Sequence, residues 1–267
     1  MILEAIILGI LQGLTEFLPI SSTGHLILAE WAFGWKGELM DNLAFDVALH
    51  AGTLFAVLWY FRRDWLQLGG AVLKVMRGKA QAYEARLVWY LVLATVPAVI
   101  VGMRYDDVVE NAFRNPLLVA AALAAGSLVM WLADRFSSRS RSLASMTLGH
   151  ALLVGVAQAA ALVPGVSRSG ATISAALAVG YKREDAARFS FLLSTPIIAG
   201  AGLFKLRHIT FQGHAAWGCI LGTLSAAVVG YLAIRFLIRY LERHSLDLFV
   251  WYRVGLAGAA VVLWLAR

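Results

Sequence analysis

Residues 158–177 read QAAALVPGVSRSGATISAAL, and this stretch decides the fold. Apolar residues flank a centre that holds Pro164, Gly165 and Arg168 together with several hydroxyl side chains. Proline breaks a helix, and an arginine is costly in an apolar environment. We therefore expect two short helices joined by a turn, with polar side chains gathered at that turn.

The composition places this turn in a membrane protein. Of 267 residues, 60% are hydrophobic and only 15% are charged, whereas soluble domains have about 45–50% apolar and about 25% charged residues. The mean hydropathy is +0.74. The first segment has no basic leader region or small-residue cleavage site, so we interpret it as part of the mature protein. The runs long enough to cross a bilayer are roughly 44–61, 86–104, 116–134, 187–204, 215–238 and 247–266.

A second broken segment lies near the start of the chain. Residues 18–25 read LPISSTGH and interrupt an apolar stretch as residues 164–172 do. The pieces on either side are near or below spanning length, and irregular backbone is tolerated at membrane depth only inside protein or beside a wet cavity. The sequence therefore predicts two re-entrant helix–loop–helix hairpins. The expected single membrane domain consists of hairpin 1–34, three spans in 44–134, hairpin 147–180 and three spans in 187–266.

The two broken segments also resemble each other in sequence. Paired short, interrupted segments in two halves of a chain are typical of an inverted repeat with a binding site near the bilayer midplane. The predicted fold is thus an all-α integral membrane protein with six full transmembrane helices and two re-entrant hairpins in an inverted repeat. At a constant offset of 146 positions, Gly9 aligns with Gly155, Gln12 with Gln158, Ser21 with Ser167, and Gly24 with Gly170.

The distribution of cations predicts the orientation. The net charge is +7, but the cations cluster in short loops between apolar runs, which argues against a nucleic-acid-binding face. A cation-rich side is expected to be cytoplasmic. Both termini, the first hairpin, residue 40 and the 104–115 loop then face outward, and the site opens toward the periplasm. The cation-rich loops are 62–86, 135–147, 181–188 and 239–247.

Polar side chains concentrate around the first break. Gln12 and Glu16 lie four residues apart, so they share one face of a helix. Ser22 follows the break at a position suited to capping the next helix, and His25 lies three residues further on. Hydroxyl, imidazole and carboxylate are the parts of an activated nucleophile, with Ser21 as the neighbour that could exchange roles with Ser22. The alternative interpretation is a capped helix with a polar tip.

The second break contains a positively charged residue, Arg168. Arg168 offers a planar guanidinium that suits phosphate and stays charged when buried. Ser167, Ser169 and Thr172 add hydroxyl donors, and we expect Ser169 to cap the following helix. If the two turns meet, two helix N-termini face one cavity and favour an anion. The alternative is that Arg168 only pairs with Glu16 and that the hydroxyls satisfy loop backbone.

Other reactive side chains receive no chemical role. His50 lies on an apolar run, where we expect a packed, hydrogen-bonded side chain. Cys219 is the only cysteine, which excludes a disulfide framework and a cysteine metal site.

The motifs QGLTEFLPISSTGH, at 12–25, and PGVSRSGAT, at 164–172, resemble the two signatures of the bacterial undecaprenyl-diphosphate phosphatases of the bacitracin-resistance type. The resemblance extends over essentially the whole chain, and the pair of motifs is highly specific. Many members of the family carry glutamate where this chain has Gln12, which bears on any mechanism that needs two carboxylates.

The resemblance implies hydrolysis of undecaprenyl diphosphate to undecaprenyl phosphate and phosphate in the bacterial inner membrane. This reaction recycles the lipid carrier for peptidoglycan and other cell-wall polymers. It further implies a divalent cation, Mg²⁺ or Ca²⁺, with Glu16 as its candidate ligand. In this interpretation Ser22 attacks the terminal phosphorus, His25 takes its proton, and Glu16 orients His25 or binds the cation. The residues expected to hold the diphosphate are Arg168, Gln12, Ser21, Ser167, Ser169 and Thr172.

A transporter is the main alternative, because interrupted inverted repeats around a midplane site are also transporter architecture. A polyprenyl-phosphate flippase needs the arginine and the helix ends, but it needs neither nucleophile nor base. The expected partners are a polyprenyl diphosphate and membrane lipids, without nucleic acid. The sequence leaves the oligomeric state open, with a homodimer as the assembly considered.

Overall fold

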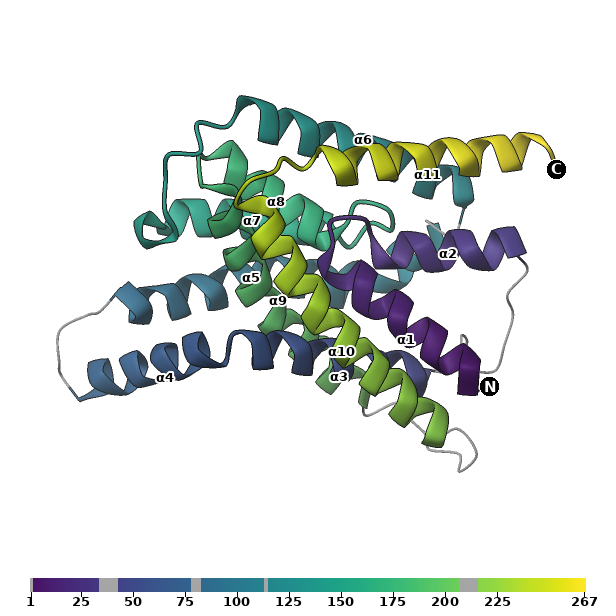
Figure 1. Cartoon of the computed structure of the whole chain (residues 1–267). Helices are drawn as coiled ribbons and strands as arrows, with labels where there is room; N and C mark the ends of the chain where they lie inside the picture. Colours follow the sequence, from purple (N-terminus) through teal and green to yellow (C-terminus); the bar gives the residue numbers. More distant parts are fainter. Residues whose placement is uncertain (1, 34–42, 78–82, 113–114, 207–215) are drawn as a thin grey trace.

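The computed structural model describes residues 2–33, 43–77, 83–112, 115–206 and 216–267, and these residues form helices joined by short turns (Figure 1). The first half contains α1 (Ile2–Phe17), α2 (Ser22–Phe33), α3 (Leu43–Tyr60), α4 (Arg62–Met76), α5 (Tyr83–Ala112) and α6 (Pro116–Phe136). The second half contains a 3₁₀ turn (Leu143–Ser145), α7 (Leu148–Ala160), α8 (Arg168–Ala178), α9 (Arg183–Leu206), α10 (Ala216–Leu241) and α11 (Asp247–Leu265).

Six helices are long and apolar enough to cross a membrane, so the expected number of spans is confirmed within the described residues. The chain is therefore a multi-pass membrane protein. The helices α1, α2, α7 and α8 are too short to belong to this set, as the breaks at 18–25 and 164–172 predict. The spanning segments are 43–60, 83–104, 116–136, 183–205, 217–241 and 247–265.

Two expectations for the connections are wrong. Residues 62–86 were expected to form a loop, but α4 occupies most of this segment as an amphipathic helix. Leu68 and Ala71 are buried, while Arg62 and Arg63 are exposed, so a cation-rich sequence hides an apolar helical face. Helix α5 likewise continues into the expected 104–115 loop and ends at Ala112. Residue 40 lies outside the described residues.

Helix packing brings the two halves together through small residues. Helix α1 packs against α10, and α7 packs against α5, while α6 lies along α11 (Figure 1). A Cβ atom on Gly9 would lie 2.4 Å from the carbonyl oxygen of Gly222, and one on Gly155 would lie 2.3 Å from that of Ala94. Glycine at both positions therefore lets helix backbones touch, as is common between membrane helices. This packing fixes the ends of α1 and α7, from which the two turns project.

Candidate active site

The two turns that follow α1 and α7 are in direct contact. The Ser21 Oγ accepts hydrogen bonds from the backbone N–H of Gly24, at 3.3 Å, and of Gly165 in the other turn, at 3.2 Å. The Ser169 hydroxyl donates to the carbonyl oxygen of Leu18 at 3.1 Å. The expected convergence of the two breaks is therefore present in the structure.

Both turns end in the same capping arrangement. Ser21 has φ of 76° and Ser167 has φ of 74°, and each side chain accepts a hydrogen bond from the backbone N–H three residues ahead. Ser22 and Arg168 are consequently the first residues of α2 and α8. The expected caps, Ser22 and Ser169, are wrong, because the residue before each helix provides the side chain that reaches the free N–H.

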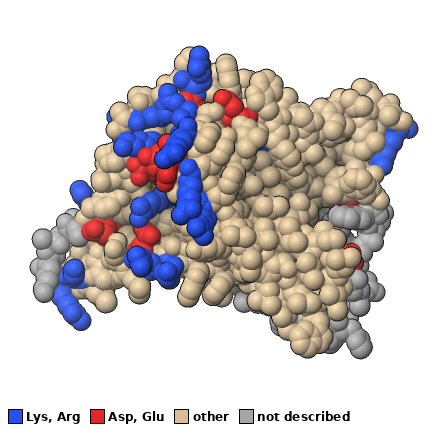
Figure 2. All heavy atoms as spheres, in the orientation of Figure 1, with Lys and Arg blue, Asp and Glu red and all other residues tan. Residues whose placement is uncertain are grey.

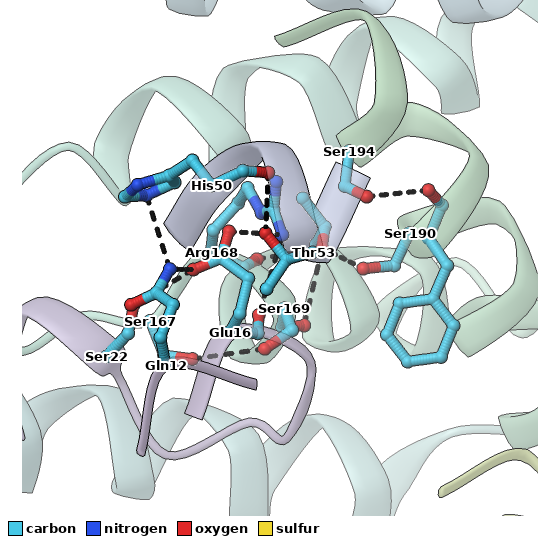
Figure 3. A network of polar contacts seen from close by, with 12 residues as sticks. Gln12, Glu16, Ser22, His50, Thr53, Ser167, Arg168, Ser169, Ser190 and Ser194 are labelled. Carbon is cyan, nitrogen blue, oxygen red and sulfur yellow. Dashed lines mark hydrogen bonds and ion pairs between the residues drawn. The ribbon is translucent and has the colours of Figure 1, made fainter. Parts of the chain in front are cut away.

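Glu16 connects the two turns electrostatically. Its Oε1 lies 3.1 Å from Arg168 Nη2. Its Oε2 accepts hydrogen bonds from the Ser22 hydroxyl at 3.1 Å and from Gln12 Nε2 at 3.2 Å. Figure 3 shows these side chains directed toward one another. The predicted common face of Gln12 and Glu16 is confirmed, and the proposed nucleophile, carboxylate and arginine meet at one point.

A cavity of about 210 Å³ lies at this meeting point. Because a water occupies about 30 Å³ in the liquid, this space has room for a small group and a few waters. Leu162, Ile197 and Ile198 add apolar side chains to the lining of the same cavity. The polar wall includes Glu16, Ser21, Ser22, His50, Ser167 and Arg168.

Three predicted substrate donors lie behind this wall. Gln12, Ser169 and Thr172 are almost completely buried and do not line the cavity. The Thr172 hydroxyl donates to the Arg168 carbonyl at 2.8 Å and lies 2.6 Å from Ser190 Oγ. Ser169 and Thr172 therefore hold the helix that presents Arg168, and Gln12 supports Glu16. The structure places all three side chains outside the lining of the cavity.

His25 does not contact Ser22 among the hydrogen bonds of the described residues. Its Nδ1 lies 2.7 Å from the Ser21 carbonyl oxygen, and its Nε2 lies 2.8 Å from the Tyr252 hydroxyl. The two rings also stack, with centroids 5.6 Å apart. Since one ring nitrogen contacts the first turn and the other contacts α11, the structure places His25 beside the turn rather than in the cavity.

The sequence interpretation missed His50. Its side chain lines the cavity, and its Nε2 lies 3.3 Å from Gln12 Nε2. On the opposite side of the ring, Nδ1 lies 3.3 Å from the Asp46 carboxylate. The signal was present, because Asp46 and His50 are polar residues four positions apart on an otherwise apolar run.

A second missed residue is Arg253, in the middle of α11. Its fully buried guanidinium donates to the carbonyl oxygens of Pro19, in the first turn, and of Gly165 and Val166, in the second, at 3.0–3.2 Å. Its Nε also donates to Ser127 Oγ at 3.0 Å. Arg253 thus ties both turns to the surrounding helices. A charged residue inside a spanning run was the available sequence signal.

The fold and the cavity define an integral membrane protein with a polar cavity, in which a hydroxyl, a carboxylate and an arginine face one another. A family model described as "Bacitracin resistance protein BacA" matches residues 5–259. The chain belongs to this family.

Curated relatives match over nearly the full length. A protein named undecaprenyl-diphosphatase from Pelotomaculum thermopropionicum is 47% identical over 266 residues, which cover 100% of this chain and 98% of the relative. Proteins of the same name from Moorella thermoacetica and Alcanivorax borkumensis are each 48% identical, with 100% and 98% of this chain and 99% and 98% of the relatives covered.

Proposed function

We propose that this protein hydrolyses undecaprenyl diphosphate to undecaprenyl phosphate and inorganic phosphate, and that it thereby recycles the lipid carrier for cell-wall synthesis and confers bacitracin resistance. Family membership and the name shared by the relatives support this activity. The observation that carries it is the meeting of Ser22, Glu16 and Arg168 in one cavity with an apolar wall.

The side chains of the cavity divide the chemistry between them. Arg168 and Ser167 hold the terminal phosphate, and Arg168 stabilises the charge that spreads over its oxygens during transfer. The Ser22 oxygen attacks the terminal phosphorus while the bond to the bridging oxygen breaks and undecaprenyl phosphate leaves. The Ser22 proton passes to Glu16, because this carboxylate already accepts the Ser22 hydrogen bond at 3.1 Å.

His25 then takes a positioning role in place of general base. Its hydrogen bonds to the Ser21 carbonyl and to Tyr252 hold the turn that presents Ser22. We expect His25→Ala to lower turnover about tenfold by loosening this turn, and the double variant with Ser22→Ala to be no worse than Ser22→Ala alone. A loss in His25→Ala as severe as that in Ser22→Ala would restore His25 as the base.

A divalent cation, Mg²⁺ or Ca²⁺, fits this site only if the substrate phosphates supply some of its ligands. Within the described residues no group of three or more His, Cys, Asp or Glu side chains is placed to hold a metal, and Glu16 is the carboxylate of the cavity. Mg²⁺ is commonly held by one or two carboxylates together with substrate phosphates and water. When bound, the cation neutralises charge on the phosphoryl oxygens. We expect chelation by EDTA to abolish turnover and added Mg²⁺ or Ca²⁺ to restore it.

The re-entrant hairpins and the inverted repeat are part of the same proposal. The equivalent caps at Ser21 and Ser167 support a repeat, as does the exchanged packing of α1 on α10 and of α7 on α5. Figure 2 shows Lys and Arg gathered at the end of the molecule where α4 lies. This end is then cytoplasmic, both termini face outward, and the site opens toward the periplasm of the inner membrane.

Thiol labelling in intact cells tests this orientation. In a Cys219→Ser background, a cysteine at the exposed position Leu3 is expected to react with an impermeant reagent. A cysteine at the exposed position Ser138 is expected to react only after the cells are opened. The reverse pattern would contradict the orientation.

Phosphate release by the purified protein in detergent tests the activity itself. Micelles have no two compartments, so a flippase that uses the same phosphate site cannot produce a signal in this assay. We expect stoichiometric release of phosphate from undecaprenyl diphosphate. No release by a folded protein that still binds the lipid would favour the transporter.

A further inference from the structure

The side chain of His50 lines the cavity and is held in one orientation by Asp46. The exposed fraction of its side chain is 33%, and the residue lines the same cavity as Ser22 and Arg168. Its Nδ1 lies 2.9 Å from the Asp46 carbonyl oxygen and 3.3 Å from the Asp46 carboxylate. Since both neighbours of Nδ1 are acceptors, this nitrogen carries the hydrogen of the neutral ring.

The other ring nitrogen, Nε2, then carries the lone pair of the neutral ring. Its neighbour is Gln12 Nε2 at 3.3 Å, an amide group that donates to it. A carboxylate beside one ring nitrogen and an accepting lone pair on the other is the arrangement that makes histidine an effective general base. Asp46 is in turn held by Lys205, whose Nζ lies 2.9 Å from its second carboxylate oxygen.

Charged groups reach His50 from several packed elements. Asp46 lies on the same helix, Glu16 comes from α1, Arg168 from α8 and Lys205 from α9. Helix α10 contacts the same segment of α3 through a neutral group. The Thr223 hydroxyl donates to the carbonyl oxygen of Ala48 at 2.9 Å. The carboxylates of Asp46 and Glu16 stabilise the protonated form of the ring, which is the form that it takes after accepting a proton.

Glu16 and His50 therefore lie at different positions in one cavity, and each can accept a proton there. Glu16 accepts the hydrogen bond of Ser22, so it occupies the position of the base for attack by this hydroxyl. Building on the proposed function, we infer that His50, oriented by Asp46, is the catalytic base for the second half of the reaction, the hydrolysis of a phosphoserine formed at Ser22.

The second step balances with these two groups. A water oxygen bonds to phosphorus, the bond between phosphorus and the Ser22 oxygen breaks, and one water proton passes to His50 Nε2. The Ser22 oxygen regains its proton from Glu16, phosphate leaves, and His50 releases its proton to the aqueous side. The water takes the place of the Gln12 contact, which at 3.3 Å is longer than usual for a hydrogen bond and easily replaced.

The test is a single-turnover and steady-state comparison of His50→Gln with wild type in detergent. Because the first step keeps its base, His50→Gln should release one equivalent of undecaprenyl phosphate rapidly. Phosphate release should then be about a hundredfold slower than in wild type. Mass spectrometry should find the phosphoryl group on Ser22. His244→Gln is the matched control, since this exposed histidine contacts Tyr240 alone among the described residues, through a hydrogen bond to its carbonyl and by ring stacking.

Asp46→Asn provides a second variant that leaves the imidazole in place. It should also accumulate phosphoserine, with a smaller loss of rate, because the ring keeps its backbone acceptor at 2.9 Å. A merely structural role for His50 would slow both products equally and leave no phosphoserine, which would overturn the inference. Wild-type rates in both variants would overturn it as well, while leaving the proposed function intact. Failure of wild type to release phosphate would instead overturn the proposed function.

Discussion

The two turns of this protein have the same backbone conformation but carry side chains of different chemistry. Both place a serine with positive φ immediately before a short helix, and both serines cap that helix. The first helical residue is Ser22 in one turn and Arg168 in the other, and these two positions are related by the same offset of 146 that relates the caps. The repeated geometry therefore presents a hydroxyl from one side and a guanidinium from the other.

The helices that precede the turns differ in the same way. Gln12 in α1 bonds to Glu16 and faces His50, and it links the carboxylate to the cavity wall. Gln158, its counterpart in α7, is equally buried but has no hydrogen-bond partner among the described residues. The two helices are therefore alike in burial, while the carboxylate that lines the cavity and its supporting contacts belong to the first half.

The largest expected effect comes from the first turn. Ser22→Ala should lower phosphate release by at least about a thousandfold, because no other hydroxyl is bonded to Glu16 in the described structure. Binding of the lipid diphosphate should change little, because Arg168 remains. Ser138→Ala, at the cation-rich end, is the control. Retention of a sizeable fraction of turnover in Ser22→Ala would mean that water attacks phosphorus directly.

The equivalent position in the second turn should respond differently. Arg168→Lys keeps a positive charge but loses the planar pair of donors, so we expect turnover to fall about a hundredfold. Lipid binding should also weaken, in contrast to Ser22→Ala. Arg243→Lys, in an exposed loop, serves as control. A loss below about threefold, well under 1 kcal/mol, would reduce Arg168 to a simple point charge.

The residue that joins the turns should affect stability and activity together. Arg253→Gln removes most of the donors that satisfy the carbonyls of Pro19, Gly165 and Val166, and each buried carbonyl left without a partner costs about 1–3 kcal/mol. We expect the midpoint of thermal unfolding in detergent to fall by about 10 °C. An unchanged midpoint would show that the turns hold together without this residue.

The smallest effects should separate the paired glutamines. Gln158→Leu should leave turnover within about twofold and stability unchanged or improved, because the buried amide has no partner to lose among the described residues. Gln12→Leu should lower turnover about tenfold, because Glu16 loses a donor at 3.2 Å. Equal effects of the two substitutions would remove the functional difference between the halves.

The sequence predicted the elements better than the contacts. The six spans and both breaks follow from hydropathy, proline and glycine, which act locally. Helix α4 was not predicted, because its segment is rich in cations and its apolar face is narrow, so the segment was interpreted as a loop. The meeting of Glu16, Ser22 and Arg168 was predicted, because polar residues at two breaks in a membrane protein need one common polar site.

Contacts that depend on tertiary packing could not be obtained in this way. His25 is turned toward Tyr252, on a helix that follows it by more than 200 residues, and spacing within SSTGH gives no information about such a partner. His50 enters the cavity because α3 packs beside α1, and the depth of Thr172 depends on its contact with α9. Side-chain direction at these positions is set by neighbouring helices rather than by local sequence.

A structure with a nonhydrolysable diphosphate lipid, in which a methylene group replaces the bridging oxygen, tests most directly whether the two turns form one phosphatase site. The terminal phosphonate is expected in the cavity between the turns, hydrogen-bonded to Arg168 and Ser167, with Ser22 opposite the methylene group. The prenyl chain should leave along Leu162, Ile197 and Ile198. Phosphonate bound elsewhere, or bound with Ser22 on the side of the methylene group, would contradict the account.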